Sequence, residues 1–238
     1  MKTLRYFSLI LLLALLAPTL LLAAAPGREV RAVAAFTKLG LANSARVVLR
    51  QGSPQRVEVE ASAADLAKLE TTVEGGKLRI GIKNQEGKMW SNERFEGNVT
   101  VYVTMPTVEA LSVSGSGQLE ATDAVKAGAL DLAVSGSGKI LLPQLTADKL
   151  NTAVSGSGEI MVAGVCPQHE ARISGSGDVR ASNLRTEASA IRISGSGNGR
   201  LYASRTLEAS IAGSGNVYVR GGANVSSKIA GSGRVRKE

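Results

Sequence analysis

Apolar and polar residues alternate along the second half of the chain, on both sides of a Gly-Ser-Gly tripeptide that recurs seven times. Alternation with a period of two is typical of β-strands, whereas a helix would need a period of 3.6 and would be weakened by the glycines. Each copy of the tripeptide therefore predicts a corner between two short strands. The glycines expected at these corners are Gly115 and Gly117, Gly136 and Gly138, Gly156 and Gly158, Gly175 and Gly177, Gly195 and Gly197, Gly213 and Gly215, and Gly231 and Gly233.

A β-branched residue stands two positions before every corner, where the alternation directs it into the core. A second apolar position follows four residues after the first glycine, and only one copy departs from it, with Gly199. Flexible Gly-Ser spacers have no apolar residues at fixed positions, so these columns exclude a flexible linker. The first column consists of Val113, Val134, Val154, Ile173, Ile193, Ile211 and Ile229.

Successive corners begin 21, 20, 19, 20, 18 and 18 residues apart, a period typical of solenoids. Ordering a single coil costs roughly 20–40 kcal/mol of backbone entropy, while each inward aliphatic side chain returns only about 1.5–3 kcal/mol. Stacking stabilises the coils, because each interior coil then forms hydrogen bonds on both edges and shares a continuous core. We therefore predict an all-β solenoid with 18–21 residues per coil, in which Lys139 lies beside Glu159 on an outer face.

Two physical reasons would explain a glycine at both ends of each corner: backbone angles closed to other residues, or close approach of chain segments at a tight bend. The central serines would then stack as a ladder of hydroxyl groups. A serine nucleophile needs an adjacent base, and a phosphate-binding loop needs a lysine and a helix; the tripeptide has neither. We therefore interpret the tripeptide as structural and expect any localised function where the repeat is broken.

The first half of the chain, residues 26–110, lacks the tripeptide but is also rich in alternating apolar residues. Strands are predicted at 28–36, 45–50, 55–61 and 99–103, a short helix at 62–70 capped by Ser62, and a tight turn at Gly75–Gly76. We expect this half to form the first irregular coils of the same solenoid, ahead of regular coils over residues 111–238. The polar loop at 84–98 holds Trp90 and Phe95, which are candidate binding residues, although such aromatic residues more often cover an open sheet edge.

The N-terminus has the pattern of a secretory signal peptide over residues 1–25. Lys2 and Arg5 precede an apolar run at 6–22, and three alanines at 23–25 provide a cleavage site. The alternative is an uncleaved membrane anchor, since the run is only slightly shorter than a bilayer span. We expect an exported bacterial protein, in the periplasm or at the cell surface, whose mature chain does not insert into a membrane.

Composition removes several classes of function. Without Lys2 and Arg5 the formal charge falls from +8 to +6, the remaining basic residues are scattered, and aromatic residues make up only 3% of the chain, so nucleic-acid binding is not expected. Cys166 is the only cysteine, which excludes an intramolecular disulfide, and we expect it to be a core thiol. His169 is the only histidine, so no metal site, cofactor or catalytic pairing is expected.

Three parts of the sequence carry a resemblance to a known family. The V-S-G-S-G coils, preceded by FTKLGLANSARVVLRQGSPQRVEVEA and LETTVEGGKLRIGI, resemble the bacterial family called putative auto-transporter adhesin, head GIN domain, over residues 30–235. The resemblance implies a right-handed, single-stranded parallel β-helix of secreted or envelope proteins, and it supplies no catalytic residues. An autotransporter needs a C-terminal membrane barrel, which this sequence lacks, so we do not expect self-translocation.

Two functions from different classes remain open. The first is a non-enzymatic, adhesin-like binding or structural module that contacts an envelope protein or a glycan along one solenoid face. The second is a polysaccharide lyase or hydrolase, because stacked coils could place Glu159 and Asp178 about 5 Å apart, as glycoside hydrolysis requires, although no cluster of His, Asp or Arg is expected around them. Calcium binding has weaker support, because it needs recurring aspartates and only one of the seven corners is followed by Asp, at Asp178. Ice binding through the serine ladder has weaker support still.

Overall fold

The computed structural model describes residues 27–83 and 94–238, and in these residues twenty strands form a single sheet with one short helix. The predicted signal peptide and Trp90 lie outside the described residues. The N-terminal elements are β1(Gly27–Arg31), β2(Lys38–Leu41), β3(Arg46–Gln51), β4(Arg56–Ala61), α1(Ala63–Lys68), β5(Leu69–Glu74), β6(Lys77–Ile82) and β7(Thr100–Met105). The repeat coils contain β8(Ala110–Gly115), β9(Gln118–Ala121), β10(Val125–Gly136), β11(Lys139–Gly156), β12(Glu159–Val165), β13(Gln168–Gly175), β14(Asp178–Arg185), β15(Ala188–Gly195), β16(Asn198–Tyr202), β17(Thr206–Gly213), β18(Asn216–Arg220), β19(Asn224–Gly231) and β20(Arg234–Lys237).

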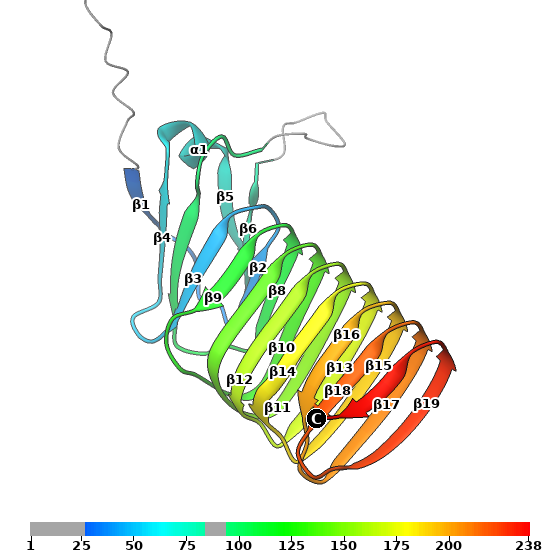
Figure 1. Cartoon of the computed structure of the whole chain (residues 1–238). Coiled ribbons are helices and arrows are strands. Elements are labelled where there is room, and N and C mark those ends of the chain that lie inside the picture. Colours follow the sequence, from blue (N-terminus) through cyan, green and yellow to red (C-terminus); the bar gives the residue numbers. More distant parts are fainter. Residues whose placement is uncertain (1–26, 84–93) are drawn as a thin grey trace, which may run out of the picture.

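The repeat coils stack as parallel strands, as the period of the tripeptide predicts. We call the strands that run into a corner the leading strands (β8, β10, the second half of β11, β13, β15, β17 and β19) and those that leave it the trailing strands (β9, the first half of β11, β12, β14, β16, β18 and β20). Leading strands pair in a register that places each first glycine beside the first glycine of the next corner, as in Gly136↔Gly156. Figure 1 shows the result, a solenoid whose corners follow one edge.

The columns of apolar residues on both sides of the corner form the core. In the first column every residue from Val113 to Ile211 is at most 2% exposed. Ile229 is the exception at 43%, so its assignment to the core is wrong: its strand, β19, pairs only with β17 within the described chain, and no coil covers its other side. Gly199 leaves a gap in the second column that Ile191 fills, since a Cβ at Gly199 would lie 2.2 Å from the Ile191 Cδ1 atom.

The N-terminal region places a coil in the stack in an order that the sequence analysis did not predict. β2 pairs in parallel with both β6 and β8, and β3 pairs in parallel with both β7 and β9. The coil formed by β2 and β3 therefore lies between the β6–β7 pair and the first repeat coil, although it precedes both in the sequence. The strand predicted at 28–36 is correspondingly shorter, because β1 ends at Arg31 and the chain then leads to β2 at Lys38.

Antiparallel strands and the helix occupy the end of the stack remote from β19 (Figure 1). β5 pairs antiparallel with β6, and β4 pairs antiparallel with both β7 and β1. Ser62 caps α1 as predicted, since its Oγ accepts a hydrogen bond from the backbone N–H of Asp65. Leu69 at the end of α1 is fully buried, and Leu66 packs against the core.

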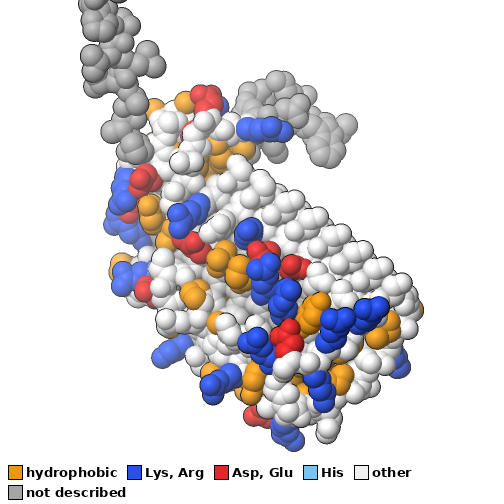
Figure 2. All heavy atoms as spheres, in the orientation of Figure 1, with side chains coloured by type: hydrophobic (Ala, Val, Ile, Leu, Met, Phe, Trp, Pro, Cys, Tyr) orange, Lys and Arg blue, Asp and Glu red, His pale blue; other side chains and the backbone are white. Residues whose placement is uncertain are grey.

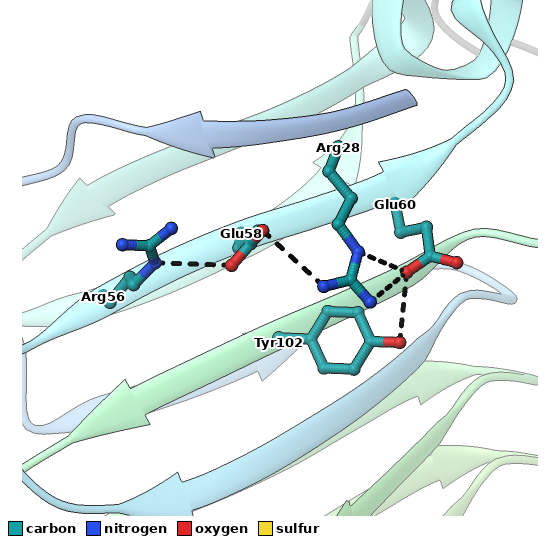
Figure 3. Close-up of polar contacts among 5 residues, drawn as sticks. All are labelled: Arg28, Arg56, Glu58, Glu60 and Tyr102. Carbon is teal, nitrogen blue, oxygen red and sulfur yellow. Dashed lines mark hydrogen bonds and ion pairs between the residues drawn. The ribbon is translucent and has the colours of Figure 1, made fainter. Parts of the chain in front are cut away.

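Side chains on β1, β4 and β7 form an ion-pair network that joins these antiparallel strands (Figure 3). The Arg28 Nε donates to Glu60 Oε2 at 2.8 Å, and its guanidinium lies 5.0 Å from the centre of the Tyr102 ring. The Tyr102 hydroxyl donates to the same Glu60 oxygen at 3.3 Å, while Arg56 Nε donates to Glu58 Oε2 at 3.3 Å. Since these charges satisfy one another, we interpret the network as structural.

Candidate functional site

The two glycines of each corner differ in backbone conformation. The first glycine has a positive φ in all seven copies, between 105° and 131°, a conformation that side chains disfavour. The second is buried against the preceding coil: at Gly158 a Cβ would lie 2.3 Å from Val134 Cγ1 and 2.7 Å from the Gly138 carbonyl oxygen. Both physical reasons offered for glycine therefore apply. The backbone angle requires glycine at the first position, and close approach disfavours a side chain at both, since a Cβ at Gly136 would lie 2.8 Å from the Gly115 carbonyl oxygen.

The central serine of every corner is exposed, from Ser116 to Ser232. The serines lie on successive coils and form a ridge along the row of corners. In Figure 2 the same side of the solenoid is a band free of charged side chains, next to a face where basic, acidic and apolar side chains gather. Within residues 27–83 and 94–238, no charged side chain forms a hydrogen bond with these serine hydroxyls, which is consistent with a structural corner.

Glu159 and Asp178 lie beside each other in the register of β12 and β14, as the coil stacking predicts. The structure adds a residue that the sequence analysis missed: Arg180 Nε lies 2.7 Å from Glu159 Oε1, and Arg180 Nη2 lies 3.6 Å from Asp178 Oδ2. Lys139 Nζ lies 3.6 Å from Glu159 Oε2, as expected from the stacking. Period-two alternation places residues 178 and 180 on the same face, and this signal could have revealed the guanidinium.

This guanidinium changes the interpretation of the carboxylate pair. A glycosidase pair needs open space between its carboxylates for the sugar and, in inverting enzymes, for water. Here Arg180 contacts both carboxylates, and Glu159 is bound from a second side by Lys139. A single arginine, which the sequence analysis did not place here, therefore lies between the carboxylates, and the arrangement is an ion-pair network on the trailing strands.

Cys166 and His169 are both buried. The Cys166 Sγ donates to the Gln168 carbonyl oxygen at 3.1 Å, and burial raises the pKa of this thiol. His169 Nε2 lies 3.0 Å from Thr152 Oγ1, and burial lowers the pKa of His169 to about 4. A buried thiol with a raised pKa is a poor nucleophile, and the imidazole is neutral at physiological pH, so both residues are parts of the core.

Phe95 is partly buried and packs against the hydrophobic core, which is the behaviour expected of an aromatic residue that covers a sheet edge. Its predicted companion, Trp90, lies outside the described residues. In the part of the chain that the structure describes, no group of three or more His, Cys, Asp or Glu is placed to hold a metal ion. No helix within residues 27–83 and 94–238 is long and apolar enough to cross a membrane.

A groove of about 710 Å³ runs across the outer face of the leading strands, and the sequence analysis did not identify it. We call it the leading-face groove. Its floor consists of small side chains. Ser112, Ala133 and Ala153 stand three positions before the first glycine of successive corners, and a serine stands one position before each of these glycines. The next two coils break this pattern by placing Arg172 and Arg192 at the same position.

The groove is flanked by positive charge. Lys77 lines one end, and Arg172 and Arg192 lie toward the other end, where Ser210 and Ala212 complete the lining. The lining contains no Asp or Glu. Arg172 has an ion pair with Glu170 at 3.2 Å, whereas within the described residues Lys77 and Arg192 have none. The signal that could have revealed this site is the change from serine and alanine to arginine in one outward-facing column.

The fold and the groove define a parallel β-solenoid with an extended, cation-flanked surface. The sequence matches the family described as "Putative auto-transporter adhesin, head GIN domain" over residues 35–223, and the chain belongs to this family. No curated protein sequence matches the chain.

Several solved structures share the fold. A "putative adhesin" from Bacteroides fragilis has a TM-score of 0.82 and 20% identity, covering 91% of this chain and 98% of its own. A "putative lipid binding protein" from Parabacteroides distasonis has a TM-score of 0.74 and 22% identity, with coverage of 91% and 98%. A "putative adhesin" from the same species has a TM-score of 0.72 and 24% identity, with coverage of 90% and 97%. At these identities the likeness concerns the fold alone.

Proposed function

We propose that this chain is a non-enzymatic, adhesin-like binding module of the bacterial cell envelope or cell surface. The observation that carries the proposal is the leading-face groove, an elongated surface built from the regular outer face of successive coils. Stacked coils characteristically provide extended binding surfaces of this kind. The partner would be an envelope glycan or protein that lies along the leading strands.

Two further observations support this proposal. The fold is shared with structures described as adhesins, and the family is named for adhesins. Residues 1–25 have the pattern of a signal peptide, which would export the chain to the periplasm or the surface, or hold it at the membrane if uncleaved. The alternative of a polysaccharide-acting enzyme loses support because Arg180 contacts both candidate carboxylates.

Capture from the envelope tests the proposed function. The purified chain would be immobilised on beads and incubated with envelope glycans and envelope proteins from the source organism, with beads carrying an unrelated protein of equal net charge as the control. We expect selective retention of at least one glycan or protein fraction. Equal retention on both kinds of bead would contradict the proposal.

A further inference from the structure

The leading-face groove has an elongated floor. It crosses β8, β10, β11, β13, β15 and β17, which at about 4.8 Å between neighbouring strands corresponds to roughly 24 Å. Its floor side chains are serine and alanine over the first three of these strands. A ligand that fills this groove must therefore be extended, and it can approach the sheet closely over most of its length.

Lys77 reaches the groove from outside the repeat coils. It belongs to β6, two strands before β8, and its side chain crosses the intervening strand above Gly40. A Cβ placed on Gly40 would lie 2.6 Å from Lys77 Cε, 3.2 Å from Lys77 Nζ and 3.2 Å from Ser112 Oγ. The absence of a side chain at Gly40 thus lets the ammonium group lie next to the first serine of the floor.

Cations consequently stand at both ends of the small-residue floor, with Lys77 at one end and Arg172 and Arg192 at the other. Asp131 and Glu170 stand on the same leading strands, two residues before Ala133 and Arg172 and therefore farther from the corners. These acidic residues are not part of the lining. An elongated ligand with anionic groups at intervals would meet positive charge at both ends and hydroxyl groups between them.

The arrangement distinguishes between classes of extended anions. A peptide strand is recognised through the free backbone edge of a sheet, but strands β8 to β17 are paired on both sides along the groove. Single-stranded nucleic acids are held by aromatic side chains that stack on the bases, and the groove lining has none. Serine hydroxyls, alanine methyl groups and cations remain, and these groups suit a polymer of sugar rings, which have apolar faces as well as hydroxyl and acidic groups.

We propose that the leading-face groove binds an acidic polysaccharide, whose anionic groups contact Lys77, Arg172 and Arg192 and whose hydroxyl groups hydrogen-bond to the floor serines. The inference rests on the proposed binding function and gives its partner a chemical class. Arg192 contributes most, because it has no ion pair with a described residue, while Arg172 must share its guanidinium with Glu170.

Binding of the purified chain to polygalacturonate and alginate, with neutral dextran as the comparison, tests this proposal. We expect binding to an acidic polysaccharide and none to dextran. The double variant Arg172→Gln/Arg192→Gln should bind at least about tenfold more weakly. Ala133→Glu should weaken binding similarly, because Ala133 is exposed on the floor and the substitution places a carboxylate between the cations.

The matched control is Arg234→Gln/Arg236→Gln, which removes the same charge from the trailing strand β20. Circular dichroism spectra identical to the wild type would establish that each variant is folded. Equal weakening in the groove and control variants would show attraction by net charge and overturn the proposal, as would absence of binding to both acidic polysaccharides. Equally tight, groove-dependent binding of poly-glutamate would also overturn it. If the wild-type chain retains envelope material on beads but binds neither acidic polysaccharide, the proposed function stands and this inference fails.

Discussion

The coil formed by β2 and β3 and the seven repeat coils make equivalent corners with different residues. The register places Leu41 beside Val113 and Arg46 beside Gln118, so Asn43-Ser44-Ala45 stands where the repeat has Gly-Ser-Gly. The backbone N–H of Gly117 donates to the Asn43 carbonyl oxygen at 2.9 Å, which joins the two corners directly. The Asn43 side chain stabilises its own corner by accepting a hydrogen bond from the Ala45 N–H at 2.9 Å.

The difference teaches when glycine is needed. In the repeat, the second glycine lies against a corner of the preceding coil, and a Cβ would collide with that corner's carbonyl oxygen. The coil that precedes Asn43 in the stack consists of β6, which ends at Ile82, and β7, which begins at Thr100. No two-residue corner therefore connects these two strands. Ala45 therefore keeps its side chain, which is 2% exposed. At this second position of the corner, Cβ is excluded by close approach of coils and not by the bend itself.

The largest expected effect concerns the shared core column. Leu41→Ala and Ile173→Ala remove side chains that are at most 2% exposed, and each should lower the free energy of unfolding by about 3–4 kcal/mol. Ile229→Ala, in the same column but 43% exposed, should cost less than about 1 kcal/mol. Urea unfolding followed by circular dichroism measures all three. If Leu41→Ala behaved like Ile229→Ala, the β2–β3 coil would not share the core of the repeat.

Substitutions at the corners test the role of close approach. Gly158→Ala should lower the free energy of unfolding by about 3 kcal/mol, because its Cβ would collide with Val134 and the Gly138 carbonyl. The reverse change in the other region, Ala45→Gly, should cost only about 1 kcal/mol, mainly from the greater freedom of glycine in the unfolded chain. Unfolding midpoints in guanidinium chloride compare the two. Equal losses would refute the distinction between the two kinds of corner.

Acid should destabilise the repeat through His169. The pKa of this residue is about 4 in the folded chain and 6.5 when unperturbed, so between these values the unfolded chain binds a proton that the folded chain does not. Stability should therefore fall as the pH drops from 6.5 to about 4, by roughly 2–3 kcal/mol. His169→Leu should remove this dependence, since Leu150 stands at the equivalent position of the preceding coil. Unfolding at a series of pH values measures it, and an unchanged pH profile in the variant would contradict the assignment.

The N-terminal region should respond to acid in a lower pH range, through Asp65. Burial opposes the charge of this carboxylate, but hydrogen bonds from the Glu96 N–H, the Ser62 hydroxyl and the Gly97 N–H outweigh it and lower the pKa of Asp65. The stability it contributes is present at neutral pH and is lost as the pH falls below the ordinary aspartate range. Asp65→Asn should cost about 2 kcal/mol at pH 7 and progressively less in acid. A cost that did not change with pH would show that the charge is unimportant.

The smallest effect is expected from ion pairs on the outer face. Arg46 pairs with Glu120 across the boundary between the two regions, and Lys139 pairs with Glu159 within the repeat. Arg46→Gln and Lys139→Gln should each cost less than about 1 kcal/mol, because both cations are more than half exposed. Thermal unfolding at low and high salt measures the difference. A larger loss for Arg46→Gln would mean that the boundary depends on charge as well as on the core.

Most of the repeat could be predicted from particular residues, and the N-terminal region less well. The column from Val113 to Ile211 and the paired glycines keep the same positions relative to each other in every copy. The interpretation of one copy as two short strands joined by a corner therefore applied to all of them. The strand Lys38–Leu41 was missed because its four residues include Gly40 and its corner has no tripeptide. Ile229 was misplaced because a column in the sequence does not reveal which coil lacks a neighbour.

The sequence by itself determined the corners, the inward columns and the stacking, since side-chain alternation and the backbone freedom of glycine are local properties. Only the tertiary structure decided that β2 and β3 enter the stack after β6 and β7, that Arg180 contacts Glu159 on the neighbouring strand, and that Lys77 lines the same groove as Arg172 and Arg192. The physical reason is that each depends on which strands become neighbours, and residues distant in the sequence meet only when the sheet forms. The Gly-Ser-Gly corner shapes the solenoid, and the arginines that interrupt its small-residue face mark the candidate site.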